Sequence, residues 1–259
     1  RSFEVTFWRS AFNALALSIA LTAMRGPALW RGLFAASRVV WISARCWSVM
    51  CTAFMLALTL TTVANVLVTM ALGPMITALF ARFVFGEHLP RRTWLAIFVA
   101  ACGIAWMFGA EIGDGDFPLG SLVACAVPLA AAINWTVLQR VAKAGEKAPD
   151  MLPAVLIGAV LSALFSLPLA WPLQASSHDL GLLALLGTVQ LAIPCLLVVR
   201  VSRYLPAPEI ALLGLLEVVF GVASAWLWAG EPLSINVLLG GGLVLAALVA
   251  NEALALRRH

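Results

Sequence analysis

Long apolar runs separated by short polar gaps dominate the chain. An α-helix needs about 20 mostly apolar residues to cross the hydrocarbon core of a bilayer. Nine runs are close to this length, at residues 5–24, 44–62, 64–85, 92–109, 118–140, 151–171, 180–200, 207–229 and 234–255. The join between the second and third runs is the least clear, because few polar residues mark it. The pattern predicts an all-α membrane protein with nine transmembrane helices in this chain.

The composition agrees with a lipid environment. Hydrophobic residues make up 63% of the 259 residues and charged residues 11%, and the mean hydropathy is +1.02. A soluble domain of this size would precipitate with so much apolar surface. The five cysteines lie in or beside apolar runs, without a Cys-x-x-Cys pair or a nearby histidine. We interpret them as small packing residues and expect no metal site.

The basic residues lie mainly in alternate gaps. Fourteen of the sixteen Lys and Arg share one predicted face, including Arg25, Arg31, Arg38 and Arg45 in the first gap. Cytoplasmic loops carry the excess of Lys and Arg, so this face is predicted to be cytoplasmic. The last helix then leaves the C-terminus in the cytoplasm, and we expect a multi-pass protein of the bacterial inner membrane.

Two similar stretches indicate an internal duplication. Residues 71–87 and 215–231 are both apolar, both end in Gly-Glu and are both followed by another apolar run. We therefore assign a first repeat to residues 1–110 and a second to residues 111–259. The chain does not start with methionine, and Arg1 and Arg9 fall on the outer face. These facts lead to the hypothesis that one upstream helix is missing, whose restoration would give an inverted repeat of five-helix units.

Several short motifs follow one another along both halves of the chain, in an order and spacing typical of one family of membrane proteins. They are Phe7-Trp8-Arg9-Ser10, Ala57 to Ala64, Pro74 and Gly86-Glu87, then Arg203-Tyr204-Leu205-Pro206-Ala207, Glu217 and Gly230 to Ser234. Together they resemble the EamA-type exporters of the drug/metabolite transporter superfamily. Two positions depart from the family pattern: Val218 replaces a usual proline, and Leu60 or Thr61 replaces a usual aromatic residue. The resemblance implies a ten-helix carrier with a central cavity that exports small metabolites or amino acids.

Glu217 is the sharpest single signal for function. It lies near the middle of an apolar run, between Leu216 and Val218. A charged group at the bilayer centre costs about 2.5 to 3.5 kcal/mol on insertion scales, so a carboxylate there needs a partner, a cavity or a proton. One interpretation is a cavity carboxylate that binds a cationic group or a transported proton. The alternative is a neutral acid that holds helices together by hydrogen bonds.

The other predicted substrate-binding residues lie in apolar runs that contain prolines: Asn134, Trp135, Gln190 and Met70. A proline frees the carbonyl four residues before it, so Pro194 frees that of Gln190 and Pro74 that of Met70. Bare carbonyls at membrane depth line a cavity or meet a partner. Trp135 is suited to stack on a flat or cationic group. Hydrogen bonding between helices, worth roughly 0.6 kcal/mol on average, is the alternative for the two amides.

Other features are interpreted as structural. Arg9 and Arg82 are predicted to extend to opposite membrane surfaces with their stems along apolar surface. The Gly-Glu pairs are predicted to end one helix and begin the next. The run Gly240-Gly241-Gly242 is predicted to be a close-packing face.

These observations predict a secondary transporter that works by alternating access, with Glu217 as the candidate for proton coupling. The expected partners are a small-molecule substrate and the bilayer, not nucleic acid; a homodimer is left open. The chain has no G-x-x-x-x-G-K-[ST] motif, so we expect neither ATP nor another cofactor. Two alternatives are a membrane enzyme acting on lipid and a flippase-like subunit that needs a partner protein. The enzyme is disfavoured because no acids accompany the basic residues at one face, so we expect no enzymatic activity.

Overall fold

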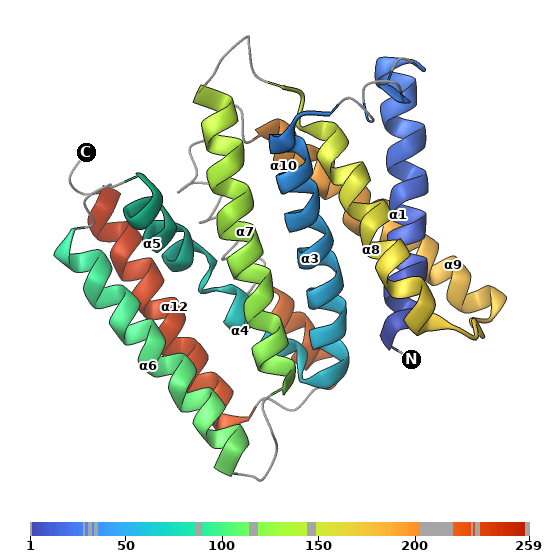
Figure 1. Ribbon diagram of the computed structural model, residues 1–259. Helices are drawn as coiled ribbons and strands as arrows, with labels where there is room; N and C mark the ends of the chain where they lie inside the picture. Colours follow the sequence, from blue (N-terminus) through green and yellow to red (C-terminus); the bar gives the residue numbers. More distant parts are fainter. Residues whose placement is uncertain are drawn as a thin grey trace. The chain divides into compact units, whose positions relative to one another are not determined.

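The computed structural model describes residues 2–27, 29–30, 33, 36–85, 90–113, 119–143, 149–201, 220–228, 230 and 234–256. Throughout these residues the regular structure is helical, without a β-strand (Figure 1). The helices are α1 (Ser2–Arg25), α3 (Arg38–Leu60), α4 (Val63–Met70), α5 (Gly73–Phe85), α6 (Arg91–Gly113), α7 (Leu119–Lys143), α8 (Leu152–Ala170), α9 (Ser177–Leu185), the π-helix η2 (Leu186–Ala192), α10 (Ile193–Val201) and α12 (Ile235–Leu256). Residues 220–228 are also helical.

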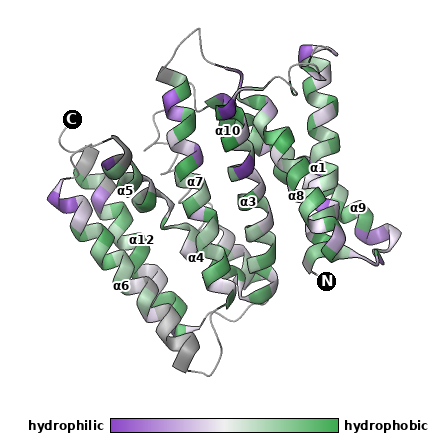
Figure 2. Ribbon diagram, viewed as in Figure 1, coloured by the Kyte–Doolittle hydropathy of each residue, from purple (hydrophilic) through white to green (hydrophobic). Residues whose placement is uncertain are grey.

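The helices confirm the predicted all-α fold. Within the described residues, five helical segments are long and apolar enough to cross a membrane: Arg38–Leu60, Val63–Phe80, Leu119–Ala142, Leu152–Ala170 and Ser177–Val201. Hydrophobic residues cover most of each helix in Figure 2, and the strongly hydrophilic positions gather mainly near helix ends. One boundary differs clearly from the prediction, because α3 begins at Arg38 rather than at residue 44. Hydropathy marks the stretch suited to lipid, whereas a helix can continue through polar residues beyond it.

The chain forms two compact units, and each draws on both halves of the sequence. Unit 1 consists of Arg1–Leu56 and Ile133–Ala207, and unit 2 of Ala57–Ala132 and Pro208–His259. The helices α3 and α7 each continue from one unit into the other. These units are therefore not the two sequence repeats, whose assignment to residues 1–110 and 111–259 stays a prediction.

In unit 1, one face of α1 is buried along most of its length. The buried positions recur every three or four residues, as expected for one face of a helix: Thr6, Arg9, Ser10, Asn13, Leu17 and Leu21. The first four are polar and the last two apolar. Leu17 and Leu21 belong to a hydrophobic core that also contains Ala44 of α3 and Val155 of α8. The polar part of the face therefore needs partners other than this core.

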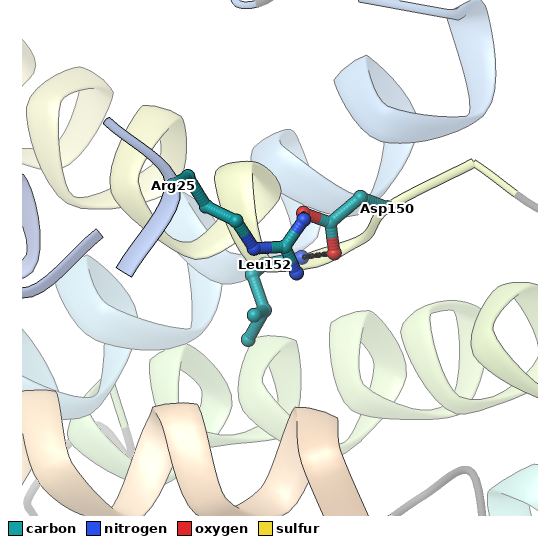
Figure 3. Close-up of polar contacts among 3 residues, drawn as sticks. All are labelled: Arg25, Asp150 and Leu152. Carbon is teal, nitrogen blue, oxygen red and sulfur yellow. Dashed lines mark hydrogen bonds and ion pairs between the residues drawn. The ribbon is translucent and has the colours of Figure 1, made fainter. Parts of the chain in front are cut away.

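Polar contacts fix both ends of α1. Near its start, the buried Glu4 carboxylate accepts hydrogen bonds from the backbone N–H groups of Gln174 and Ala175. At its end, Arg25 forms an ion pair with Asp150, at 2.7 Å between Nη1 and Oδ2. Asp150 also accepts the N–H of Leu152 in the first turn of α8, as Figure 3 shows. Because both charged side chains are partly exposed, we expect this ion pair to contribute at most about 1 kcal/mol.

In unit 2, the apolar run 64–85 is interrupted shortly before Pro74. The helix α4 begins after Thr62, whose hydroxyl accepts the N–H of Asn65 at 3.2 Å, and it ends at Met70. A turn over Ala71 and Leu72 leads into α5, where Pro74 is the second residue. A proline is tolerated in the first turn of a helix, where an N–H would have no helical partner. The interruption therefore falls where the proline requires it.

The helices α6 and α12 of unit 2 pack closely. A Cβ atom at Gly103 would lie 2.7 Å from the carbonyl oxygen of Gly240 and 3.1 Å from Cγ2 of Val244. A Cβ at Gly241 would lie 2.9 Å from Cγ2 of Val68, whereas one at Gly242 would meet no atom within 4 Å. The predicted close-packing face is thus confirmed for Gly240 and Gly241. Gly230, which follows the helical residues 220–228, has a φ of 64°, typical of a glycine that ends a helix.

Candidate functional site

Buried polar side chains are concentrated in unit 1. They are Glu4, Thr6, Arg9, Ser10, Asn13, Ser43, Asn134, Thr136, Ser162 and Ser166. Among the described residues of unit 2, the corresponding set is Asn65, Thr69, Thr93 and Ser121. Polar groups inside membrane helices are costly, and an ionisable group there is a candidate for a substrate or ion pathway, whereas hydroxyls and amides also hold helices together. The interior of unit 1 is therefore the candidate site.

The described set contains two charged side chains, Glu4 and Arg9, and Arg9 lies deeper in α1. It lies seven residues after the start of α1, about 10 Å along the helix axis, and is 5% exposed. Its Nη2 donates a hydrogen bond to Oε1 of Gln190 at 3.0 Å. Its guanidinium carbon lies 5.8 Å from the centroid of the Phe54 ring, within the range of a cation–π interaction. The prediction that Arg9 extends to the membrane surface is wrong, because the side chain has partners inside unit 1.

Gln190 lies in the π-helix η2, where the backbone departs from α-helical hydrogen bonding. The N–H of Ile193 donates to the carbonyl of Thr188, five residues before it. Pro194 follows Ile193 and has no N–H, so it cannot donate a helical hydrogen bond to this turn. Such π-helical turns occur frequently at functional sites. The Gln190 side chain is exposed and reaches back to α1.

Gly187 allows η2 to approach the α1 backbone beside Arg9. A Cβ atom at this position would lie 2.6 Å from the carbonyl oxygen of Arg9, 2.8 Å from Cβ of Phe12 and 3.0 Å from the nitrogen of Asn13. These are atoms of the backbone or next to it, so a side chain would push the two helices apart. The absence of a side chain at Gly187 thus brings Gln190 within reach of Arg9.

Three hydroxyl groups form a chain between α1, α8 and α3. Ser162 of α8 lies 3.0 Å from the hydroxyl of Ser10 and 2.8 Å from that of Thr52. Each hydroxyl is able to donate one hydrogen bond and accept two, so the direction of the chain is adjustable. Ser10 follows Arg9 on α1, and Thr52 lies two residues before Phe54 on α3. The hydroxyl chain and the Arg9 contacts therefore reach the same turn of α3.

A second group of polar and aromatic residues lies between α3 and α7. The Ser43 hydroxyl donates to Oδ1 of Asn134 at 2.6 Å, and the rings of Trp47 and Trp135 meet edge to face at a centroid distance of 6.1 Å. Asn134 is fully buried. Within the described chain, neither Nδ2 of Asn134 nor Nε1 of Trp47 has a hydrogen-bond acceptor. Two buried donors without acceptors are costly, and a ligand oxygen would satisfy them.

The predicted site residues are only partly brought together. Asn134, Trp135 and Gln190 all belong to unit 1, but Asn134 bonds to α3 and Gln190 to α1. Met70 is the half-buried last residue of α4 in unit 2. Glu217 lies outside the residues that the structure describes. A single site containing all five residues stays a prediction.

Several members of the unit 1 set were not predicted from the sequence as site residues, above all Arg9 and its hydroxyl neighbours. The available signal was the spacing of Thr6, Arg9, Ser10 and Asn13, which places four polar residues on one face of a helix. For metals, the described residues contain no group of three or more His, Cys, Asp or Glu side chains able to hold an ion. The site therefore offers hydrogen-bond donors, a cation and aromatic faces.

Comparisons with known proteins agree with this architecture. The model of the EamA-like transporter family matches residues 1–109 and 118–251. Among solved structures, one crystal structure aligns with 99% of this chain and 88% of its own chain, with a TM-score of 0.64 and 18% identity, which shows the fold alone. No curated protein matches the chain. Since the family model covers most of the chain in two matches, this multi-pass membrane protein belongs to the EamA-like transporter family.

Proposed function

We propose that the protein exports a small organic metabolite, such as an amino acid, across the bacterial inner membrane by alternating access. The observation that carries this proposal is the match of the transporter family over both halves of the chain. Buried polar groups in the helices of unit 1 support it, because a carrier needs groups inside the membrane that replace the hydration of its substrate. The distribution of Lys and Arg supports a cytoplasmic C-terminus.

The group between α3 and α7, which includes Asn134 and Trp135, supplies candidate substrate contacts in unit 1. The Nδ2 of Asn134 is a buried donor suited to a carbonyl or carboxylate oxygen. Trp135, held edge to face by Trp47, offers an apolar ring surface. Gln190 presents an exposed carboxamide that binds either donors or acceptors. The part of Met70 in this proposal rests on its place before the helix break at Pro74.

Proton coupling is assigned to Glu217 on the sequence alone. A carboxylate in the middle of an apolar run is more easily kept neutral than charged, so it can take up a proton at one membrane face and release it at the other. Export driven by protons entering the cell requires such a group to alternate between its charged and neutral forms. This proposal predicts that replacing Glu217 with a residue that does not ionise uncouples transport from the proton gradient.

The test begins with a metabolite-export screen, which compares cells that overexpress the protein with cells that overexpress Glu217→Gln. The cargo found is then measured in inverted membrane vesicles with an imposed proton gradient. We expect gradient-driven uptake by the native protein and its loss in Glu217→Gln, at similar protein levels. Asp179→Asn is the control, because Asp179 caps α9 at an exposed position and Asn retains the side-chain oxygen.

Two outcomes would contradict the proposal. Proton-driven uptake that is unchanged in Glu217→Gln would remove the coupling role of this residue. A cargo that the purified protein fails to carry in liposomes, although membrane vesicles carry it, would point to a subunit that needs a partner protein.

A further inference from the structure

Arg9 is a buried cation whose described partners are all neutral. Arginine stays protonated in proteins, and its guanidinium carries five N–H donors. Among the described residues, the guanidinium has one hydrogen-bond acceptor, Oε1 of Gln190, and one aromatic neighbour, Phe54. The acid nearest in sequence, Glu4, bonds instead to the N–H groups of Gln174 and Ala175. Neutral partners compensate little of the cost of burying a charge, so this arrangement favours the arrival of an anion.

The surroundings of Arg9 match the needs of an oxyanion. Gln190 is an exposed side chain on a π-helical turn, so an anion is able to replace it on the guanidinium without disturbing a sealed core. The hydroxyls of Ser10, Ser162 and Thr52 form an adjustable chain that includes the neighbour of Arg9 on α1. The Phe54 ring keeps the guanidinium within unit 1.

We propose that Arg9 binds a carboxylate group of the transported substrate, and that Gln190 holds the guanidinium when no substrate is bound. The inference rests on the proposed transport function and adds the residue that recognises the cargo, with the requirement that the cargo carries a carboxylate. The planar guanidinium presents two parallel N–H groups to a carboxylate. A lipid phosphate has similar oxyanion chemistry, but Arg9 is 5% exposed and lies about 10 Å into its helix, which favours a small anion.

The test compares carboxylates with their neutral carboxamides. Purified full-length protein in phosphatidylcholine nanodiscs is titrated with L-leucine beside L-leucinamide, and with benzoate beside benzamide, by isothermal calorimetry. We expect at least one carboxylate to bind at least about tenfold more tightly than its carboxamide, since charge-assisted hydrogen bonds are roughly twice as strong as neutral ones. Arg9→Gln removes this preference, and Arg9→Lys retains only part of it, because Lys keeps the charge without the planar donor pair.

Controls separate binding from folding. Arg25→Lys, at the other end of the same helix and outside the site, is expected to leave the carboxylate preference unchanged. Arg9→Gln is expected to keep or raise the melting temperature, because it removes a buried charge with neutral partners. If Arg9→Gln does not fold, the inference is tested by the native protein and Arg9→Lys alone. The native protein should prefer the carboxylate to the carboxamide, and Arg9→Lys should show a smaller preference.

The inference is overturned if neither carboxylate binds more tightly than its carboxamide, or if the preference persists in Arg9→Gln. Nanodiscs that contain phosphatidylglycerol identify the other source of an oxyanion. Stabilisation of the native protein, but not of Arg9→Gln, by this lipid alone would assign the guanidinium to a headgroup and overturn the inference. Transport of a cargo without carboxylate preference would leave the proposed function intact and refute only the role of Arg9. Carboxylate binding at Arg9 without any transport would refute the proposed function and leave only the binding site.

Discussion

Unit 1 and unit 2 use similar residues for different purposes. In unit 2, Arg92 is the second residue of α6 and donates to the carbonyl of Leu254, near the end of α12. In unit 1, Arg9 lies well inside α1, and the described partners of its guanidinium are the side chains of Gln190 and Phe54. An arginine near a helix end is close to the polar interface, where its charge remains hydrated. The same residue inside a helix is costly, which makes its retention informative about function.

The backbones that face these arginines also differ. The pair α6–α12 consists of two regular helices in contact at Gly103. The partner of α1 at Arg9 is the π-helix η2, followed by Pro194. Both contacts are close at a glycine, but π-helical turns and prolines are where helices bend. We infer that the α1–η2 contact is the adaptable one and that α6–α12 is the rigid one.

The largest expected effect comes from a side chain at Gly187. Gly187→Ala would place a Cβ 2.6 Å from the Arg9 carbonyl oxygen, so overpacking should lower the free energy of unfolding by about 1 to 3 kcal/mol. It should also separate Gln190 from Arg9 and raise the affinity for carboxylates, because Gln190 then no longer competes for the guanidinium. Gly181→Ala is the matched control on the preceding helix, because its Cβ would meet no atom within 4 Å. Melting temperatures in detergent and the calorimetric titrations measure both effects.

Gly103 supplies the corresponding pair in unit 2. Gly103→Ala should destabilise the protein to a similar extent, because its Cβ would lie 2.7 Å from the Gly240 carbonyl oxygen, while Gly242→Ala should be tolerated. The carboxylate preference of folded Gly103→Ala should match that of the native protein. A change of carboxylate affinity in Gly103→Ala equal to that in Gly187→Ala would end the distinction between the two units.

The sequence was sufficient to predict most of the helices, because the hydropathy of a long apolar run is a local property. It placed Asn134 and Gln190 among the functional candidates, since amides in apolar runs are conspicuous. It did not identify their partners Ser43 and Arg9, because a side chain's partner depends on which helices pack together and in which register. The π-helical turn at 186–192 and the division into units that each combine both halves are likewise tertiary outcomes.

An intermediate effect is expected at Ser162. Its hydroxyl bonds to both Ser10 and Thr52, so Ser162→Ala leaves two hydroxyls without this partner and should cost about 1 to 1.5 kcal/mol. Ser166→Ala is the control one turn later, because the Ser166 hydroxyl donates to a carbonyl of its own helix. Unfolding with SDS in mixed micelles gives both values. Equal losses in the two variants would show that the hydroxyl chain between helices adds no stability.

The smallest effect is expected where α6 and α12 exchange a side-chain hydrogen bond. The Thr93 hydroxyl donates to Oδ1 of Asn251 at 3.0 Å. A double-mutant cycle with Thr93→Val and Asn251→Leu isolates this contact from any other bond of Asn251, and we expect a coupling of roughly 0.6 kcal/mol, typical of membrane helices. Transport by both single variants should stay close to native, because the bond belongs to the scaffold pair.

The matched cycle in unit 1 uses Ser43→Ala and Asn134→Leu, which remove the bond between α3 and α7. Its coupling energy should be similar, because it too is a neutral hydrogen bond inside membrane helices. Transport should nevertheless fall in Asn134→Leu, since the buried Nδ2 donor is lost along with the bond to Ser43. If the two cycles give equal coupling energies but only the unit 1 variant loses transport, the two hydrogen bonds contribute equally to stability, and only the one in unit 1 is needed for function. Loss of transport in Thr93→Val would instead place α6–α12 within the moving part of the carrier.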